Sequence, residues 1–119
     1  MIFELAVATK REAIETLVEK LSELGHLQPH AVRSVVKALM HREQIGSTGI
    51  GRGVAVPHAK HTDIQRIVGI IGHAPGGIDF DSLDGKAVKK IFLFLTPPDQ
   101  PGDHLRVLER ISRMVRAAV

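Results

Sequence analysis

Apolar side chains recur every three or four residues near the start of the chain, a spacing that places them on one face of a helix. Thr9 and Glu12 match a capping box, in which each side chain accepts a hydrogen bond from the other residue's backbone N–H. Gly25 suits the C-terminal end of such a helix. The pattern predicts a helix between Thr9 and Gly25, preceded by a strand or lead-in over residues 2–8, with an apolar face of Ala13, Ile14, Leu17, Val18, Leu21 and Leu24.

Two more segments have helical periodicity. Pro29 suits the first position of a helix that ends near Arg42–Glu43. Residues 44–53, which contain four glycines, are expected to form a loop. A last helix is predicted to begin near Gly102–Asp103, with a buried side made of Leu105, Leu108, Ile111, Ser112 and Val115.

Between these helices lie short runs of apolar and β-branched residues, which are typical of strands. The candidate strands are Val54–Val56, Ile67–Ile71 and Lys90–Leu95. Pro75-Gly76-Gly77 and Asp84-Gly85 are predicted to be turns. Alternating helices and strands indicate an α/β fold with a small sheet covered by helices, and 119 residues fit a single domain over 1–119.

Composition narrows the possible functions. The chain has no cysteine, which excludes disulfides, thiolate catalysis and cysteine-ligated zinc. Four Phe and no Tyr or Trp argue against a module that stacks nucleic-acid bases on aromatic rings. The net charge of +3 comes from dispersed basic residues, which indicate solvated helix faces or a docking surface for a protein partner rather than for nucleic acid. No segment resembles a membrane span or a secretion signal, so we expect a cytoplasmic protein.

His58 stands out among the seven histidines. It follows Pro57, which cannot donate to a strand ladder and favours an extended Val56, so the next side chain is released where the strand stops. Ligands bind at the carboxyl ends of strands in open α/β sheets, and the glycines upstream allow close approach to a ligand. A surface or structural role for His58 is the alternative on spacing alone.

His104 and Arg42 are the other candidate site residues. His104 lies in the first turn of the predicted last helix, where free N–H groups and the helix dipole favour an anion and disfavour a protonated imidazole. Arg42 precedes the glycine loop, and a guanidinium can bind a phosphate with two parallel hydrogen bonds. If the helix start meets the strand end, the site suits a phosphoryl group. The alternatives for Arg42 are an exposed side chain or a cap at the C-terminal end of its own helix.

A metal site is the competing interpretation of the histidines. His58 and His61 are three residues apart and Asp63 is near. A zinc site needs three or four ligands in a rigid frame, and this pair lies in a predicted loop with no evident third ligand. The segment GIGRG also lacks the Lys-Ser/Thr ending of a nucleotide-binding loop and precedes a strand. We therefore expect no metal and no cofactor.

Together, STGIGRGVAVPH, GGIDFDSLDGK, FLFLTPP and DHLRVLERIS resemble the enzyme IIA domain of the phosphoenolpyruvate-dependent sugar phosphotransferase system, of the fructose, mannitol and nitrogen-regulatory class. The resemblance runs from about residue 9 to residue 116. It implies a mixed sheet flanked by helices on both faces. It also implies that His58 is the phosphorylated histidine, that His104 stabilises the phosphoryl group, and that Arg42 lies near the site.

The same resemblance implies partners. A histidine phosphocarrier protein would donate the phosphoryl group, and a cysteine of a IIB domain would accept it during sugar uptake. The alternative is a nitrogen-regulatory protein that binds target proteins according to its phosphorylation state. Family members usually continue beyond the helix that holds His104, so the resemblance implies either a truncated or a short member. Ala59 replaces a glycine found in many members.

Overall fold

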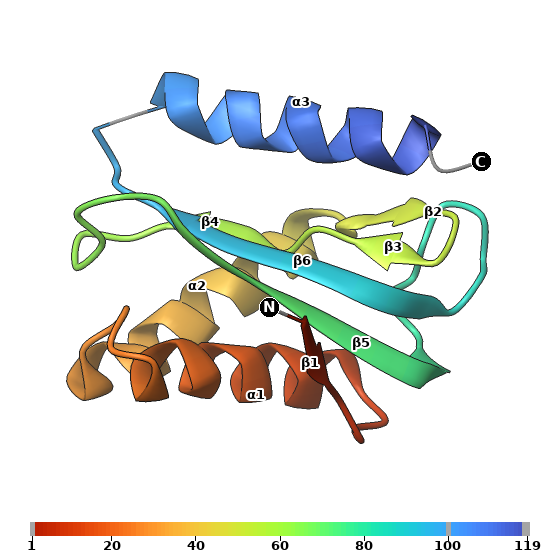
Figure 1. Ribbon diagram of the computed structural model, residues 1–119, viewed down its shortest axis with the longest axis horizontal. Helices are drawn as coiled ribbons and strands as arrows, with labels where there is room; N and C mark the ends of the chain where they lie inside the picture. Colours follow the sequence, from red (N-terminus) through yellow and green to blue (C-terminus); the bar gives the residue numbers. More distant parts are fainter. Residues whose placement is uncertain (1, 100, 118–119) are drawn as a thin grey trace.

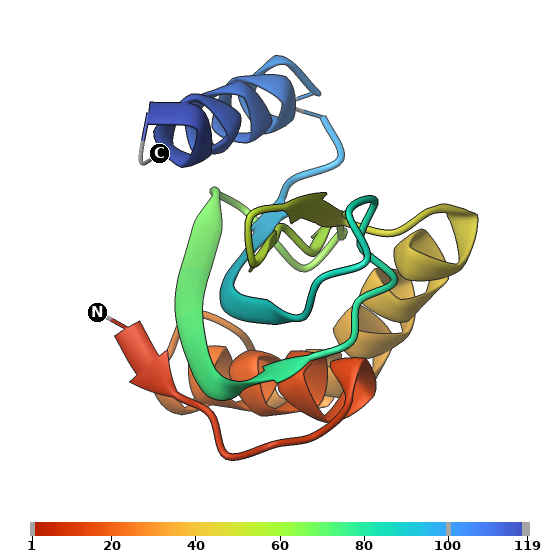
Figure 2. The same cartoon turned by 90° about the vertical axis from the view of Figure 1, so that its right-hand side faces the viewer.

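The computed structural model describes residues 2–99 and 101–117 and is built in layers (Figure 1). A six-stranded mixed sheet lies in the middle; α1 (Lys10–Glu23) and α2 (Val32–Ile45) cover one face and α3 (Pro101–Ala117) lies over the other. A view from the side shows α3 on the opposite side of the sheet from α1 and α2 (Figure 2). The expected α/β fold, with a small mixed sheet and helices on both faces, is confirmed. Within the described residues, no helix is long and apolar enough to cross a membrane.

The sheet is organised around one long strand, β6. It runs antiparallel to β5 and parallel to both β3 and β4, while β1 is parallel to β5 and β2 antiparallel to β3. The strand bounds are β1 Ile2–Glu4, β2 Gly49–Gly51, β3 Val54–Ala55, β4 His58–Lys60, β5 Val68–Ile78 and β6 Val88–Thr96. β3 and β4 lie one after the other along the same edge of β6, because Ala55 pairs with Ile91 and His58 with Phe94. The predicted strand Val54–Val56 is therefore one of two short strands separated at Pro57.

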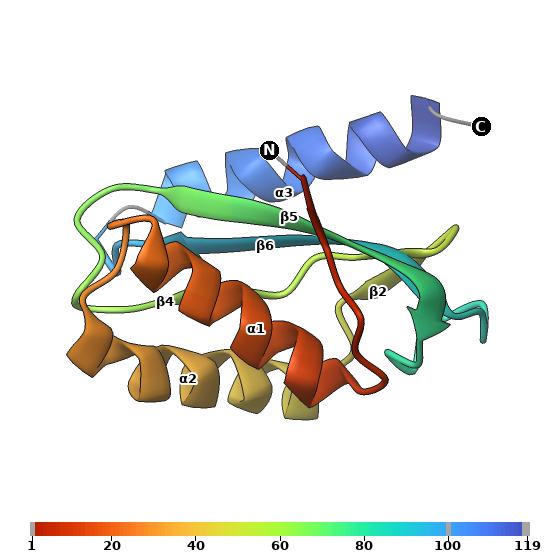
Figure 3. The ribbon, with the colours of Figure 1, turned by 60° about the horizontal axis from the view of Figure 1, so that its bottom comes forward.

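The first helix begins as the sequence predicts. The Thr9 hydroxyl accepts a hydrogen bond of 3.1 Å from the Glu12 N–H, and the Glu12 carboxylate accepts one of 3.2 Å from the Thr9 N–H. A 3₁₀ turn over Pro29–Ala31 leads into α2, which extends past the predicted end to Ile45. Seen from below, α1 and α2 run side by side under the sheet (Figure 3), where their apolar faces pack against buried strand residues to form the main core.

Two predicted irregular segments are wrong. Residues 44–53 contain β2, because Gly49 and Gly51 pair with Ala55 and Val54. Pro75-Gly76-Gly77 lies inside β5 instead of forming a turn, and the pairing register with β6 shifts between His73 and Ile78. Gly77 has a φ of 78°, and a Cβ there would lie 2.8 Å from the Ala87 Cβ. These residues therefore make an irregularity within a longer strand.

The buried side of α3 also differs from the prediction. Leu105 is 66% exposed, whereas His104 and Ile111 are buried and Val107 and Leu108 are half-buried. The inward positions thus follow the helical spacing 104, 107, 108, 111, with a histidine as the first member of the stripe. Ser112 is half-buried, and the side chain of Val115 lies outside the described residues. The helix is turned so that His104, and not Leu105, meets the sheet.

Candidate active site

His58 is the first residue of β4 and lies directly after the interruption of the strand. The Pro57 carbonyl oxygen accepts a hydrogen bond of 3.1 Å from the Phe94 N–H, which attaches the chain to β6 just before the histidine. His58 and Phe94 are register partners, and their rings stack with centroids 5.3 Å apart and planes 12° apart. The imidazole therefore lies against a fixed aromatic surface.

A backbone hydrogen bond sets the tautomer of His58. Its Nδ1 lies 2.7 Å from the Val56 carbonyl oxygen. A carbonyl can only accept, so Nδ1 carries the proton and donates it. In the neutral ring the lone pair is then on Nε2, the nitrogen that can act as a nucleophile.

His104 meets His58 across the sheet surface. Their ring centroids are 4.8 Å apart, with the planes at 68°, so one ring presents its edge to the other. The His104 ring also lies 5.2 Å from the Phe94 ring, and its Nδ1 is 2.8 Å from the Thr96 hydroxyl oxygen. The structure thus brings together the two histidines that the sequence singles out, from the start of β4 and the first turn of α3.

Both imidazoles are held in their neutral forms. Burial lowers the pKa of His58, and the Arg42 charge lowers it further, against the opposing effects of the Val56 hydrogen bond and Glu43. Burial, His58, Lys60 and Arg42 together lower the pKa of His104 to about 4. Both residues are buried, and each keeps 9% of its surface exposed.

Arg42 lies in the last turn of α2 and approaches the pair without a hydrogen bond to either ring. Its Nη1 donates to the Gly46 carbonyl oxygen at 2.7 Å, which ties the end of α2 to the glycine loop. Its positive charge nevertheless lowers the pKa of both His58 and His104. Arg42 therefore both caps the end of α2 and places its positive charge near the two histidines.

Three polar residues near the pair were not among the predicted site residues. Lys60 is two residues from His58 on β4, so both side chains project from the same face of the strand. The spacing of two residues could have indicated that Lys60 lies beside His58, but only if residues 58–60 had been predicted to form a strand. Glu43 is 8% exposed, pairs with Lys10 at 3.2 Å and accepts from the Thr48 hydroxyl and N–H, which fastens the glycine loop to α2. Thr96 is the third.

The residues of the metal interpretation make other contacts. The His61 Nδ1 accepts from the Asp63 N–H at 3.1 Å, and its Nε2 lies 2.9 Å from the Ser34 hydroxyl. Asp63 pairs with His30 at 3.6 Å. Over the part of the chain that the structure describes, no three His, Asp or Glu side chains are grouped to hold a metal ion.

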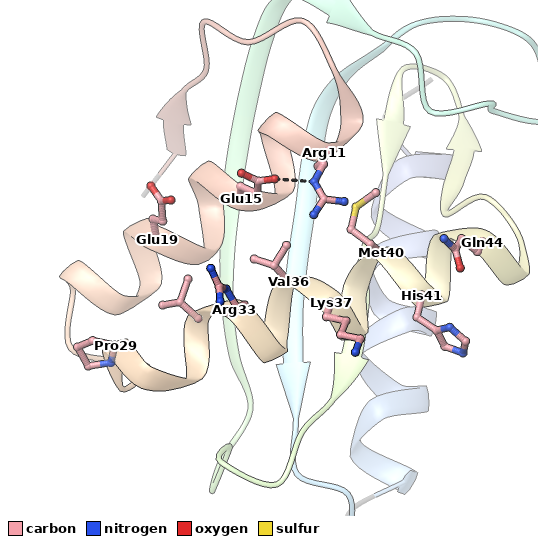
Figure 4. Close-up of a pocket in the computed structure, with 11 residues that line it drawn as sticks. Arg11, Glu15, Glu19, Pro29, Arg33, Val36, Lys37, Met40, His41 and Gln44 are labelled. Atoms are coloured by element: carbon pink, nitrogen blue, oxygen red, sulfur yellow. Dashed lines mark hydrogen bonds and ion pairs between the residues drawn. The ribbon is translucent and has the colours of Figure 1, made fainter.

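One groove in the described structure lies away from the histidines. It has a volume of about 860 Å³ and runs between α1 and α2, where Val36 and Met40 form its floor and Arg11, Glu15 and Lys37 lie along its rim (Figure 4). None of His58, His104 and Arg42 lines it.

The candidate site is defined by paired neutral imidazoles near an arginine and a lysine. This arrangement suits a nucleophile and an incoming anion.

Comparison with known proteins gives consistent matches. Residues 1–118 match the family described as phosphoenolpyruvate-dependent sugar phosphotransferase system, EIIA 2. A nitrogen regulatory protein of Bradyrhizobium diazoefficiens is 38% identical over 112 residues, which cover 94% of this chain and 71% of that protein. A PTS system fructose-specific EIIA component of Haloferax volcanii is 35% identical over 106 residues, covering 89% of this chain and 68% of that protein.

Solved structures show the same fold. The nitrogen regulatory protein IIA-Ntr from Neisseria meningitidis superposes with a TM-score of 0.82 and 33% identity, covering 92% of this chain and 73% of that chain. IIA mannitol from Escherichia coli superposes with a TM-score of 0.77 over 94% of this chain and 77% of that chain. At 23% identity, the second likeness concerns the fold alone.

Proposed function

The chain belongs to the EIIA 2 family of the phosphoenolpyruvate-dependent sugar phosphotransferase system, and we propose that it carries a phosphoryl group on Nε2 of His58. The observation that carries this proposal is the 2.7 Å hydrogen bond from His58 Nδ1 to the Val56 carbonyl oxygen. This bond leaves the Nε2 lone pair available in a ring whose lowered pKa keeps it neutral.

The proposed reaction transfers the phosphoryl group between nitrogen atoms. The Nε2 lone pair of His58 attacks the phosphorus of a phosphorylated histidine on the histidine phosphocarrier protein. The donor N–P bond breaks, and its electron pair returns to the donor imidazole. His58 keeps its Nδ1 proton throughout, and the Val56 carbonyl stabilises the positive charge that the ring gains. Phosphoryl transfer of this kind depends on alignment and charge stabilisation.

His104 and Arg42 have complementary roles in this proposal. A neutral imidazole 4.8 Å from the His58 ring can donate a hydrogen bond to a phosphoryl oxygen without placing a second cation beside the acceptor. The Arg42 guanidinium would add charge-assisted hydrogen bonds through the N–H groups that do not bond Gly46. Lys60, on the same face of β4, adds positive charge that favours the approach of a phosphorylated partner.

Incubation with phosphoenolpyruvate, enzyme I and the phosphocarrier protein tests the proposal. Intact-mass analysis should find one added phosphoryl group with the stability of a phosphohistidine, labile in acid and stable in base. His58→Ala should remain folded and incorporate no phosphate. Incorporation by His58→Ala at the wild-type level, or none by the wild type, would reject the assignment.

Two physiological roles can use this phosphohistidine. In sugar uptake, a IIB cysteine thiolate would attack the phosphorus and return the electron pair to His58. The 38% identity to a nitrogen regulatory protein favours a second candidate, a regulatory protein that binds targets according to its phosphorylation state. Phosphorylated protein should therefore be mixed with fructose-type and mannitol-type IIB domains. Rapid loss of its phosphate to the IIB cysteine supports transport, whereas retention supports regulation.

A further inference from the structure

Thr96 joins the last residue of β6 to the second histidine of the site. Its side chain is fully buried, and its hydroxyl oxygen lies 2.8 Å from His104 Nδ1. Its carbonyl oxygen already accepts a hydrogen bond of 3.1 Å from the His61 N–H. Over residues 2–99 and 101–117, His104 Nδ1 is the one hydrogen-bond partner of the Thr96 hydroxyl.

The direction of this hydrogen bond follows from the burial of the hydroxyl. A buried O–H that donates to nothing is costly, so the hydroxyl proton must go to an acceptor. His104 Nδ1 can accept only when it is unprotonated. A neutral His104 therefore holds its lone pair on Nδ1, facing Thr96, and its proton on Nε2.

The two histidines thus have opposite tautomers. The Val56 carbonyl makes His58 Nδ1 a donor and leaves a lone pair on its Nε2. The Thr96 hydroxyl makes His104 Nδ1 an acceptor and leaves a proton on its Nε2. We propose that Thr96 is a positioning residue that fixes His104 as a hydrogen-bond donor to the phosphoryl group on His58.

This role rests on the phosphoryl-carrier function proposed above and explains why His104 needs a fixed tautomer. With the proton on Nδ1, the Nε2 lone pair of His104 would face the negative phosphoryl oxygens and repel them. With the proton on Nε2, the ring donates to an oxygen while remaining neutral. No proton moves in this arrangement, because His58 attacks through a lone pair and His104 keeps its N–H.

Nitrogen-15 NMR of the histidine rings in the unphosphorylated protein at neutral pH tests the tautomers directly. His104 should show an unprotonated Nδ1 and a protonated Nε2, with His58 showing the reverse as an internal reference. A protonated Nδ1 on wild-type His104 would overturn the proposal without any variant. In Thr96→Val, which removes the hydroxyl at nearly constant volume, His104 should become a mixture of tautomers, whereas Thr96→Ser should restore the wild-type signals.

Phosphorylation kinetics test the consequence. Thr96→Val should accept phosphate about tenfold more slowly and lose it faster, as expected for one hydrogen bond to a charged group, while Thr96→Ser stays within about twofold of the wild type. Unchanged His104 signals in Thr96→Val would overturn the role of the hydroxyl. If the His104 signals change in Thr96→Val but its phosphorylation rate does not, the tautomer of His104 has no role in phosphoryl transfer. If the wild type accepts no phosphate, the carrier function fails, and the ring spectra still decide the tautomer.

Discussion

The face of the sheet under α1 and α2 is filled by apolar side chains, whereas the face under α3 combines apolar and polar groups. On the first face, Leu17, Leu21 and Leu39 have no exposed surface. The cluster on the second face is small and is accompanied by buried polar residues; its buried apolar members are Val54, Val56, Phe94 and Ile111. A cavity of about 300 Å³ also lies between the sheet and α3, lined in part by Phe92, Val107 and Ile111.

This difference separates stability from chemistry. A close-packed core tolerates little change in volume, and it supplies most of the free energy of folding. The α3 face leaves space beside the sheet and holds the neutral imidazoles. Substitutions on the first face should therefore act on unfolding, and substitutions on the second should act mainly on phosphoryl transfer.

The largest expected effect on stability is on the α1 and α2 face. Leu17→Ala should lower the free energy of unfolding by about 2–5 kcal/mol, because it leaves a cavity in a closed core. The matched change Ile111→Ala under α3 should cost only about 1–2 kcal/mol, because its side chain already borders open space. Urea denaturation of both variants measures the difference. Equal losses would contradict the distinction between the two faces.

His104 should show the opposite behaviour. His104→Ala should reduce the rate of phosphoryl acceptance by roughly 10- to 100-fold, the loss of one hydrogen bond to a charged group, and should shorten the lifetime of the phosphorylated protein. His104→Gln keeps an N–H donor and should lose less. Quench-flow phosphorylation and denaturation measured side by side check both expectations. A large loss of stability with unchanged kinetics would assign His104 to structure instead of chemistry.

Much of the fold was predictable because its signals are local. The capping box at Thr9, the periodicity of α1 and the β-branched run of β6 depend on neighbours in the sequence. The extension of β5 through Pro75-Gly76-Gly77 was not predictable, since it depends on Gly77 accommodating Ala87, the residue that precedes β6. Leu105 was assigned to the buried side because apolar patterning cannot recognise a histidine as an inward residue.

The site shows the same limit. His58 was a candidate site residue because of Pro57 and the glycines before it, and His104 because of its place in the first turn of a helix, and the structure brings the two rings within 4.8 Å of each other. The tautomers were not predictable, because they depend on the Val56 carbonyl and on the Thr96 hydroxyl, whose contact with His104 is tertiary. Thr96 precedes Pro97 and Pro98, and nothing in this local sequence distinguishes a hydroxyl that bonds an imidazole on another element.

Arg42 lies at the junction of the two regions, so its replacement should affect both modestly. Arg42→Ala removes the hydrogen bond to the Gly46 carbonyl and should cost about 0.5–1.5 kcal/mol of stability. It should also slow phosphoryl acceptance by about tenfold, since the charge that we propose stabilises the phosphoryl group is lost. Arg42→Lys keeps the charge without the planar fork and should restore part of the rate. Identical rates for all three proteins would remove Arg42 from the site.

A further expected effect is a dependence of stability on pH that arises from the α3 face. The folded protein has lowered pKa values for His58 and His104, the latter about 4, whereas an unfolded histidine titrates near 6.5. Between these values the unfolded chain binds more protons, so stability is full above about pH 6.5 and falls as the pH decreases toward 4. Asp84, whose pKa is lowered by the Lys86 and Arg52 N–H groups, contributes only below about 3.8.

Thermal unfolding between pH 7 and pH 4.5 should therefore show a decreasing melting temperature for the wild type. His104→Gln cannot be protonated at this position and should show a shallower decrease, with the remaining slope including His58. Leu17→Ala provides the matched control, because it lowers stability at every pH and leaves both imidazoles in place, so its curve should run parallel to that of the wild type. A parallel curve for His104→Gln would mean that His104 is not held neutral by its surroundings, and the chemical distinction between the two faces would lose its electrostatic basis.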